Sequence, residues 1–363
     1  MDQKVIIITG AAGFIGSSLA VELSGDHQVT ALDRREPTHA LRSSAPGVKW
    51  EKLDIADAVK VTSTFKKVKE NFGRIDLVIH LAAYYHFGDD WRPEYEKTNI
   101  TGTENLIHAA LATGVQRIIF SSSIAALEPP QPSQLLHEQS PTSDYIPYAR
   151  SKSIGEDILR KVSSEIPCTI LRLGGVFSDW CELPPLYSLI RLWSSYGPLS
   201  RIIPGKGESG FPYIHLKDVI KIIKRCIDLN SEMESYEIFM ASPNGFVSHR
   251  DIFQIVRQSL YHSHSANPVF TPRELIATGM YIKKVLAFLR NKEAYEQPWM
   301  LKFIDRPWMV DTSLTQKKLN WECSPDLDIL KKLPVIIEHY RMERKSWISR
   351  NIIRNAGEYA YIN

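Results

Sequence analysis

Three glycines near the start of the chain have the spacing of a phosphate-binding turn. Gly10, Gly13 and Gly16 follow the β-branched run of residues 5–9 and precede a helical pattern over residues 17–23, with Phe14 and Ile15 inside the turn. In such a unit the first glycine permits the turn, the second lets backbone approach a pyrophosphate, and the third lets helix pack on strand. The helix N-terminus adds free N–H groups and a partial positive charge. The stretch predicts a dinucleotide site rather than an ordinary strand–helix turn.

An acidic residue ends the second predicted strand. Asp33 lies 23 positions after Gly10. At that place a carboxylate accepts hydrogen bonds from the adenosine ribose hydroxyls and repels a 2′-phosphate. Arg34 and Arg35 follow directly, and an arginine there, with Arg34 the first candidate, offers that phosphate a partner. The sequence therefore favours NAD as the cofactor, with NADP as the less favoured alternative.

A tyrosine and a lysine four residues apart supply groups for proton transfer. Tyr148 and Lys152 share one face of a predicted helix. A nearby ammonium, like a positive nicotinamide ring, favours the phenolate of a side chain with an ordinary pKa of about 10. We therefore expect Tyr148 to be a general acid/base with a lowered pKa. Tyr213 and Lys217 repeat the spacing, but Tyr213 lies in an alternating, strand-like stretch.

A parallel sheet is needed to bring these groups together. Strand-like and helix-like stretches alternate through the first half of the chain, which predicts a Rossmann-type, doubly wound α/β fold. Ligands in such sheets bind outside the carboxyl ends of the strands. The predicted strands are residues 5–9, 28–32, 48–53, 77–80, 117–121 and 168–172.

The residues that follow two of these strands are cofactor candidates. Asp54 either accepts from the adenine amino group or caps a helix, and Ile55 would cover the adenine ring. After the fourth strand, Leu81, Ala82 and Ala83 let backbone lie against the cofactor's ribose and phosphate.

Further polar and aromatic residues are candidates for the substrate side. Tyr84 and His86 belong to an aromatic loop that either lines a substrate pocket or packs in the core. Ser121 and Ser123 belong to a triple serine after the fifth strand, where hydroxyls point toward the nicotinamide. Asn99 opens a predicted helix, as a site residue or as a plain cap.

The composition narrows the class of protein. Of 363 residues, 44% are hydrophobic and 23% are charged, which is ordinary for a soluble globular chain. A net charge of +3 is too small to indicate nucleic acid, and no stretch approaches the roughly 18 apolar residues of an integral membrane segment. Four scattered cysteines lack metal-site spacing, so we expect no metal and a reducing, cytoplasmic setting.

Together these motifs resemble the extended short-chain dehydrogenases/reductases, the family of NAD-dependent epimerases, dehydratases and 3β-hydroxysteroid-dehydrogenase-like enzymes. Residues 172–177, 212–219 and 310–322 resemble its later motifs, so the resemblance runs over essentially the whole chain. It implies that Ser123 hydrogen-bonds the substrate oxygen, Tyr148 exchanges its proton and Lys152 holds the nicotinamide ribose. It also implies that Asn99 supports the loop, and that Gly175 and Val176 lie against the cofactor.

One departure bears on the substrate. Gly175 stands where nucleotide-sugar enzymes of this family usually carry an asparagine, and residues 172–177 look more like the hydroxysteroid-dehydrogenase-like branch. This favours an oxidoreductase acting on a secondary alcohol or ketone of a small, apolar molecule. The alternative is a nucleotide-sugar epimerase or dehydratase with tightly bound NAD, with Arg306 meeting the diphosphate. A non-catalytic NAD(P)-binding protein is a third reading, disfavoured because Tyr148 and Lys152 are both present.

The domain organisation is predicted as follows. Residues 1–178 form the NAD-binding domain, with 211–242 returning to it, and residues 179–210 and 243–363 form a smaller C-terminal α/β substrate lobe and lid. Trp180 opens an aromatic, proline-rich insertion that either lines an apolar pocket or packs between lobes. The basic tail, residues 341–354, either lies on a membrane or packs on its own domain. The resemblance also suggests a homodimer through the helices near residues 102–113 and 148–163.

Overall fold

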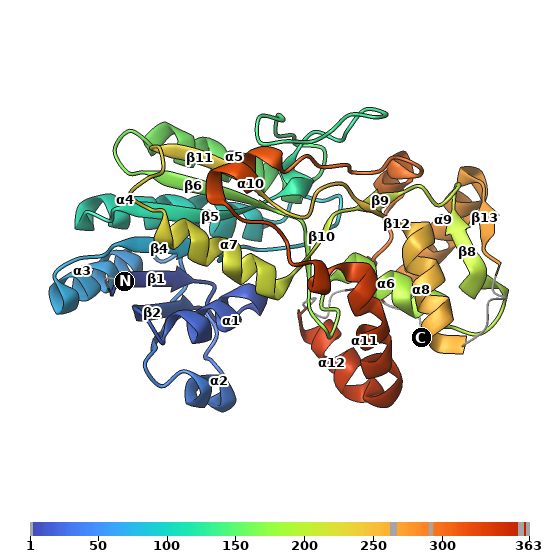
Figure 1. The fold of residues 1–363 in the computed structure, drawn as a ribbon, viewed down its shortest axis with the longest axis horizontal. Helices are drawn as coiled ribbons and strands as arrows, with labels where there is room; N and C mark the ends of the chain where they lie inside the picture. Colours follow the sequence, from blue (N-terminus) through green and yellow to red (C-terminus); the bar gives the residue numbers. More distant parts are fainter. Residues whose placement is uncertain (1–2, 262–266, 290–292, 355–358, 361–363) are drawn as a thin grey trace.

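Seven parallel strands form the central sheet in the computed structural model, which describes residues 3–261, 267–289, 293–354 and 359–360 (Figure 1). The strand order is β11-β6-β5-β4-β1-β2-β3. It reverses between β1 and β4, the place where such sheets open a crevice for ligands. The strands are β1 Val5–Thr9, β2 Gln28–Asp33, β3 Lys49–Lys52, β4 Leu77–His80, β5 Arg117–Ser123, β6 Cys168–Leu173 and β11 Tyr236–Ala241.

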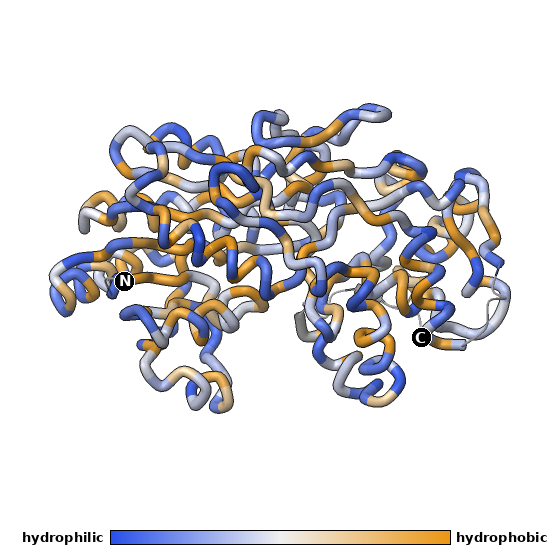
Figure 2. The backbone as a smooth tube through the Cα atoms, viewed as in Figure 1, coloured by the Kyte–Doolittle hydropathy of each residue, from blue (hydrophilic) through white to orange (hydrophobic). Residues whose placement is uncertain are grey.

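Helices cover both faces of this sheet, so the Rossmann-type prediction is confirmed. In β1, Ile6 and Ile8 pack with α1 (Phe14–Leu23) and α7 (Leu216–Asp228). Ile7 points to the other face, with α3 (Ala58–Phe72), α4 (Gly102–Thr113) and α5 (Pro147–Val162). Because both faces are covered, β1 is apolar along nearly its whole length and appears orange in Figure 2.

The fifth strand is longer than predicted. β5 continues through the serines, with Ser121 paired to Leu171 and Ser123 paired to Leu173. The prediction that the strand ends at Ser121 was therefore wrong. Since side chains alternate along a strand, Ser121 and Ser123 share one face and Ser122 points to the other.

A second hydrophobic core lies in the C-terminal half. It packs α6 (Pro184–Trp193), α8 (His249–Tyr261), α11 (Ile329–Met342) and α12 (Arg344–Arg354) around the buried rings of Trp193 and Trp347. The remaining strands are β7 Gly175–Phe177, β8 Ile202–Pro204, β9 Gly210–Phe211, β10 Tyr213–His215, β12 Val247–Ser248, β13 Val269–Thr271, β14 Glu293–Ala294 and β15 Tyr359–Ala360. The remaining helices are α2 His39–Ser44, α9 Arg273–Phe288, α10 Ser313–Leu319, the π-helix η1 Tyr95–Thr101, and the 3₁₀ turns η2 Ile124–Ala126, η3 Pro198–Arg201, η4 Pro298–Phe303 and η5 Pro325–Leu327.

Residues 216–241 supply α7 and β11, and β11 pairs with β6 at one edge of the large sheet. From the sequence, residues 211–242 were expected to return to the NAD-binding domain. The domain boundaries themselves stay a prediction. Parts of the predicted substrate lobe, residues 262–266, 290–292, 355–358 and 361–363, lie outside the described residues.

The basic tail packs on its own lobe. Trp347 is fully buried, stacked on Tyr187 and edge-on to Tyr340, and Arg350 pairs with Glu182 at 3.1 Å. Of the two alternatives for this segment, the contacts support packing on its own domain. Within the described part of the chain, no helix combines the length and the apolar character needed to cross a membrane.

Candidate active site

The glycine turn leaves no room for side chains. Gly10 has φ +68°, and a Cβ there would lie 2.7 Å from the backbone nitrogen of Ala82. A Cβ on Gly13 or Gly16 would lie 2.9 or 2.3 Å from the carbonyl oxygen of Gly10. Helix α1 follows with Gly13 as its N-cap and no side-chain cap, so its first N–H groups face the turn. This tight backbone cradle fits a pyrophosphate.

Asp33 holds the turn and a neighbouring arginine together. One carboxylate oxygen accepts from the backbone nitrogen of Ala12 at 2.9 Å, and the other accepts from the backbone nitrogen and Nε of Arg35 at 2.9 and 3.2 Å. An Nη atom of Arg35 lies 3.8 Å from where a Cβ of Gly13 would be. Both arginines are exposed, and Arg35, rather than the predicted Arg34, is the one whose side chain lies beside the cradle. The signal was the arginine pair itself, because alternation alone does not decide which of the two side chains bonds Asp33.

Asp54 does not cap a helix. Its carboxylate accepts from the backbone nitrogen of Ala56 at 3.0 Å and pairs with Lys97 at 3.3 Å, while the N-cap of α3 is Asp57. Ile55 is buried, and its side chain lies 2.7 Å from where a Cβ on Gly102 would be. The cap alternative for Asp54 is thus wrong, and the adenine contacts of Asp54 and Ile55 stay predictions.

Ser123, Tyr148 and Lys152 converge at the end of β5. Pro147 starts α5, so Tyr148 stands in its first turn and Lys152 one turn further on. The Nζ of Lys152 donates to the backbone oxygen of Ser121 at 2.7 Å. Ser123 hydrogen-bonds to the Tyr148 hydroxyl and accepts from the backbone nitrogen of Ala125 at 3.1 Å. A hydroxyl, a phenol and an ammonium therefore meet where a substrate oxygen would bind.

The titration of these groups corrects one expectation. Burial raises the pKa of Tyr148 to about 12, and its hydrogen bond with Ser123 offsets only part of that rise. Burial also lowers the pKa of Lys152 to about 8, against the attraction of Glu156. The expected lowering of the Tyr148 pKa was therefore wrong for the protein by itself, because desolvation of the phenolate outweighs the neighbouring groups.

Asn99 clamps the loop that follows β4. Its side-chain oxygen accepts from the backbone nitrogen of Tyr84 at 2.6 Å, and its Nδ2 donates to the carbonyl of Tyr84 at 3.0 Å and to the Ser151 hydroxyl at 2.9 Å. It lies within the π-helix η1, so it is not a plain α-helix cap. This clamp agrees with the loop-supporting role that the resemblance implied.

A buried histidine joins the cofactor turn to Asn99. Thr103 donates to the carbonyl of Asn99 at 2.7 Å, so its oxygen accepts from Nε2 of His80 at 3.0 Å. The other ring nitrogen then accepts from Thr9 at 2.7 Å, and the Thr9 oxygen accepts from the Ala82 backbone nitrogen at 3.3 Å. Burial lowers the pKa of His80 to about 3, so the ring is neutral. This series of hydrogen bonds was not predicted from the sequence. Its one signal was a lone histidine, His80, in an apolar strand.

The aromatic residues around Tyr148 are not the two that were predicted. Tyr85 lies edge-on to Tyr148 with ring centroids 5.0 Å apart, and Phe87 lies 5.5 Å from it. Phe87 in turn stacks on Trp299 of η4 at 6.1 Å. Tyr84 and His86 stack on each other on the side of Tyr95. Side chains of this loop alternate, so Tyr84 and His86 do not face Tyr148, and their predicted substrate contacts stay a prediction.

Two later candidates lie in tight apolar surroundings. A Cβ on Gly175 would meet side chains of Leu183, Phe211 and Tyr213 at 3.0 to 3.4 Å. Val176 packs against the sheet core.

Trp180 stacks on His339 at 4.2 Å and lies under the Arg350 guanidinium at 4.7 Å, so these contacts serve packing on α11 and α12. Its role in substrate binding therefore stays a prediction without support from these contacts.

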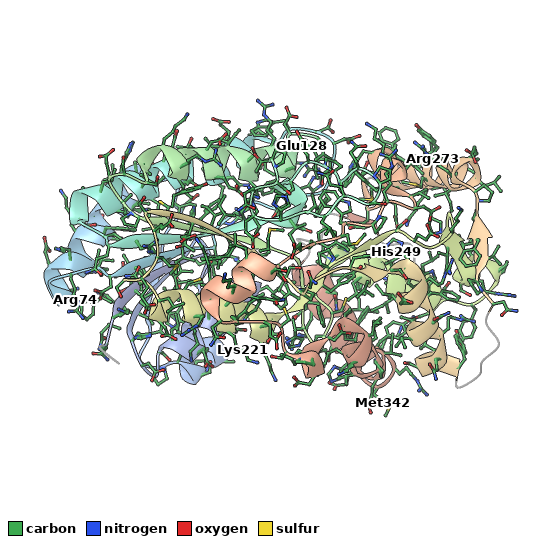
Figure 3. The ribbon with its side chains drawn as sticks, turned by 45° about the horizontal axis from the view of Figure 1, so that its top comes forward. Arg74, Glu128, Lys221, His249, Arg273 and Met342 are labelled. Carbon is green, nitrogen blue, oxygen red and sulfur yellow. The ribbon has the colours of Figure 1, made fainter. Side chains whose placement is uncertain are left out.

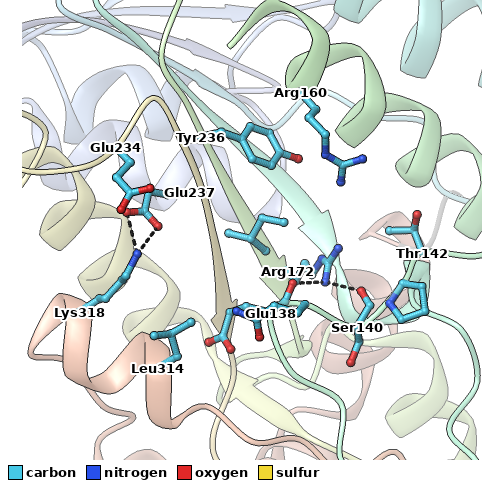
Figure 4. A pocket seen from close by; sticks show the side chains of 13 residues that line it. Glu138, Ser140, Thr142, Arg160, Arg172, Glu234, Tyr236, Glu237, Leu314 and Lys318 are labelled. Atoms are coloured by element: carbon cyan, nitrogen blue, oxygen red, sulfur yellow. Dashed lines mark hydrogen bonds and ion pairs between the residues drawn. The ribbon is translucent and has the colours of Figure 1, made fainter. Parts of the chain in front are cut away.

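A separate pocket of about 500 Å³ lies at the outer edge strand β11 (Figure 4). Its walls include Arg160, Tyr236 and Lys318, and Lys318 pairs there with Glu237 at 2.9 Å. None of the candidate catalytic residues lines it. The searched part of the chain also contains no cluster of three or more His, Cys, Asp or Glu side chains able to hold a metal ion.

The fold and these residues define a Rossmann-type, dinucleotide-dependent enzyme. A family model described as the NAD dependent epimerase/dehydratase family matches residues 6–241. The chain therefore belongs to this family, and its cofactor is NAD, as the glycine turn and Asp33 predicted.

Known proteins resemble the chain at low identity. It is 26% identical over 318 residues to a UDP-glucose 4-epimerase of Mycolicibacterium smegmatis, covering 79% of this chain and 98% of that protein. It is 24% identical over 236 residues to sterol demethylase protein B of Methylococcus capsulatus, covering 63% and 68%. The solved UDP-glucose 4-epimerase of Thermotoga maritima superposes with a TM-score of 0.69 at 20% identity, over 93% of this chain and 99% of that one. The solved structure, at 20% identity, supports the fold, and the match over 98% of the Mycolicibacterium smegmatis epimerase favours the nucleotide-sugar alternative over the main prediction of a net dehydrogenase.

Proposed function

We propose that this chain catalyses NAD-dependent hydride transfer at a secondary alcohol carbon, with Tyr148 exchanging the proton of the hydroxyl. The observation that carries the proposal is the convergence of Ser123, Tyr148 and Lys152 at the carboxyl end of β5. Ser123 hydrogen-bonds the substrate oxygen, and Lys152 fixes α5 on β5 so that the phenol faces that oxygen. When bound, NAD supplies the hydride acceptor.

The cofactor-binding residues are proposed from the glycine turn and from Asp33. The turn of Gly10, Gly13 and Gly16, with Phe14 and Ile15 opening α1, cradles the pyrophosphate, and Asp33 takes the adenosine ribose. The close approach of Gly10 to Ala82 supports a contact of residues 81–83 with the cofactor. Since burial keeps the Tyr148 pKa at about 12, the phenol holds its proton at neutral pH and offers it to an oxygen that gains negative charge.

Two substrate classes have support, and they predict different products. A nucleotide sugar, epimerised or dehydrated without net turnover of NAD, is supported by the relative matched over 98% of its length. A small apolar alcohol is supported by the aromatic wall of Tyr85, Phe87 and Trp299 and by the crowded position of Gly175. A homodimer through α4 and α5 belongs to the proposal in either case.

The first experiment identifies the nucleotide released by denaturing the purified protein. Retained NAD, followed by interconversion of UDP-sugars without NADH accumulation, supports the epimerase or dehydratase. An empty protein that binds NAD reversibly and forms NADH with hydroxysteroids or other apolar carbinols supports the dehydrogenase. A protein that turns over members of neither class, and whose NAD binding is unchanged when Asp33 is replaced, contradicts the proposal.

A further inference from the structure

Exposed apolar side chains are concentrated at one end of the molecule. Of the 17 large apolar side chains that are exposed in the described part of the chain, 12 lie in residues 192–199 and 269–289. These stretches adjoin β8 and β13, which pair with each other. Figure 1 places β8, β13 and α9 together at the end opposite α3, and in Figure 3 Arg273, at the start of α9, lies far from Arg74. Scattered exposed residues are ordinary in globular proteins, but such a concentration marks an interaction surface.

Helix α9 has its apolar face turned outward. At 100° per residue, the seven most exposed apolar residues of α9 and its C-cap Leu289 fall within an arc of about 160°. The opposite side holds Lys283, which pairs with Glu296, and the buried Ala287. We call this arc the α9 face; its members are Leu275, Tyr281, Ile282, Val285, Leu286, Phe288 and Leu289, each between 44% and 78% exposed.

Basic residues surround the α9 face. Across residues 191–208 and 267–289 there are six basic side chains against two acidic ones, Glu208 and Glu274. Two further carboxylates, Glu296 and Asp89, pair with Lys283 and Lys284. Lys206, Arg273 and Lys284 are exposed. An outward apolar helix face with tyrosine and phenylalanine, bordered by lysine and arginine, is the composition of helices that lie in the interface of an anionic bilayer.

Helix α9 is connected to the candidate active site through side chains outside the α9 face. Lys284 lies 3.8 Å from the carboxylate of Asp89, two residues beyond Phe87. Glu296, the partner of Lys283, also accepts from Ser188 at 2.6 Å and stands three residues before Trp299, which stacks on Phe87 beside Tyr148. The sides of α9 that lie outside the α9 face thus contact the segments that form the aromatic wall, while the α9 face itself points outward.

We propose that the α9 face docks this protein onto an anionic lipid surface. Two observations select lipid over a second copy of the chain. The exposed arc is broad, with Glu274 as the one charged residue inside it, as a fluid apolar phase accepts. The charges that border it are net basic, which suits an anionic lipid surface better than a second, equally basic copy of the chain. The proposal is independent of which substrate the enzyme takes.

The test is co-sedimentation of the full chain with vesicles of phosphatidylcholine, with and without phosphatidylglycerol. We expect binding to the phosphatidylglycerol vesicles and weaker binding at high salt. Val285→Glu combined with Phe288→Glu should lower the bound-to-free ratio about tenfold or more, because it places two charges in the apolar layer. The matched control combines Val59→Glu with Met342→Glu, two residues that are 79% and 78% exposed outside the α9 face, and should bind like the wild type.

Circular dichroism melts of both double variants establish that they fold. The proposal is overturned if the wild type stays in the supernatant with both vesicle types, or if the two double variants lose binding equally. A third result would also overturn it: light scattering reveals a wild-type dimer, only the Val285/Phe288 double variant is monomeric, and the wild type does not bind vesicles. The α9 face would then join two copies of the chain.

Discussion

The buried ammonium of Lys152 donates to the backbone oxygen of Ser121 at 2.7 Å. This bond joins α5 to the carboxyl end of β5, and Tyr148 stands one helical turn before Lys152. Because the ammonium of Lys152 is hydrogen-bonded to a backbone carbonyl, its main contribution is to position the phenol of Tyr148 beside Ser123. Any electrostatic help to Tyr148 must overcome the burial that raises the pKa of that phenol to about 12.

Tyr148→Phe should lower kcat by about 10² to 10⁴, because the ring still packs against Tyr85 while the exchangeable proton is gone. Binding of NAD, followed by fluorescence titration, should stay near the wild-type value. The control is Tyr213→Phe, since Tyr213 shares the four-residue spacing to a lysine but lies in β10. A Tyr148→Phe enzyme with full activity would disprove the proton-transfer role.

Asp33→Ser should raise the KM for NAD about tenfold or more, because it removes the acceptor for the ribose hydroxyls. It should also shift preference toward NADP, since the arginine beside the cradle loses its carboxylate partner. Measuring kcat/KM for both nucleotides tests this. Adding Arg35→Ala should abolish the gain with NADP, whereas Arg34→Ala should leave it; the reverse result would show that the wrong arginine was chosen.

Gly16→Ala should destabilise the fold by about 1 to 3 kcal/mol and weaken NAD binding, because its methyl group meets the backbone oxygen of Gly10 at 2.3 Å. Gly25→Ala is the matched control, since nothing lies within 4 Å of a Cβ there. Thermal unfolding and NAD titration measure both effects. Equal behaviour of the two variants would mean that close packing at the turn is unimportant.

Lowering the pH should destabilise the fold, because unfolding lets His80 take up a proton. Burial lowers its folded pKa to about 3, whereas the unfolded ring binds a proton below about 6.5, so unfolding takes up a proton between these values. The free energy of unfolding therefore drops by about 1.4 kcal/mol per pH unit below 6.5 from this group alone. Urea unfolding at pH 7 and pH 5 should show His80→Gln losing about 2 kcal/mol less than the wild type. Parallel losses in the two proteins would exclude this role.

Local patterns were enough to predict the sheet, the glycine turn, Asp33 and the Tyr148–Lys152 pair, because each depends on residues close together in sequence. The rings that meet Tyr148 were not predictable in this way. Trp299 reaches Phe87 from more than 200 residues away, and the inward choice among Tyr84, Tyr85, His86 and Phe87 depends on how Asn99 fixes the loop. The direction of the Tyr148 pKa was misjudged because spacing reveals the neighbouring lysine but not the loss of water around the phenol.

The π-helix η1 carries one consequence for comparing this chain with others. A π segment holds one residue more per turn than an α-helix of the same hydrogen-bonded length, and Asn99 lies within it. Deleting a single residue between Tyr95 and Asn99 would turn the preceding backbone by about 100° relative to α4. A relative with such a gap would keep every recognisable motif letter, yet its loop after β4 would be anchored differently. Counting residues across this segment is therefore a way to sort members of the family by the shape of their substrate pocket.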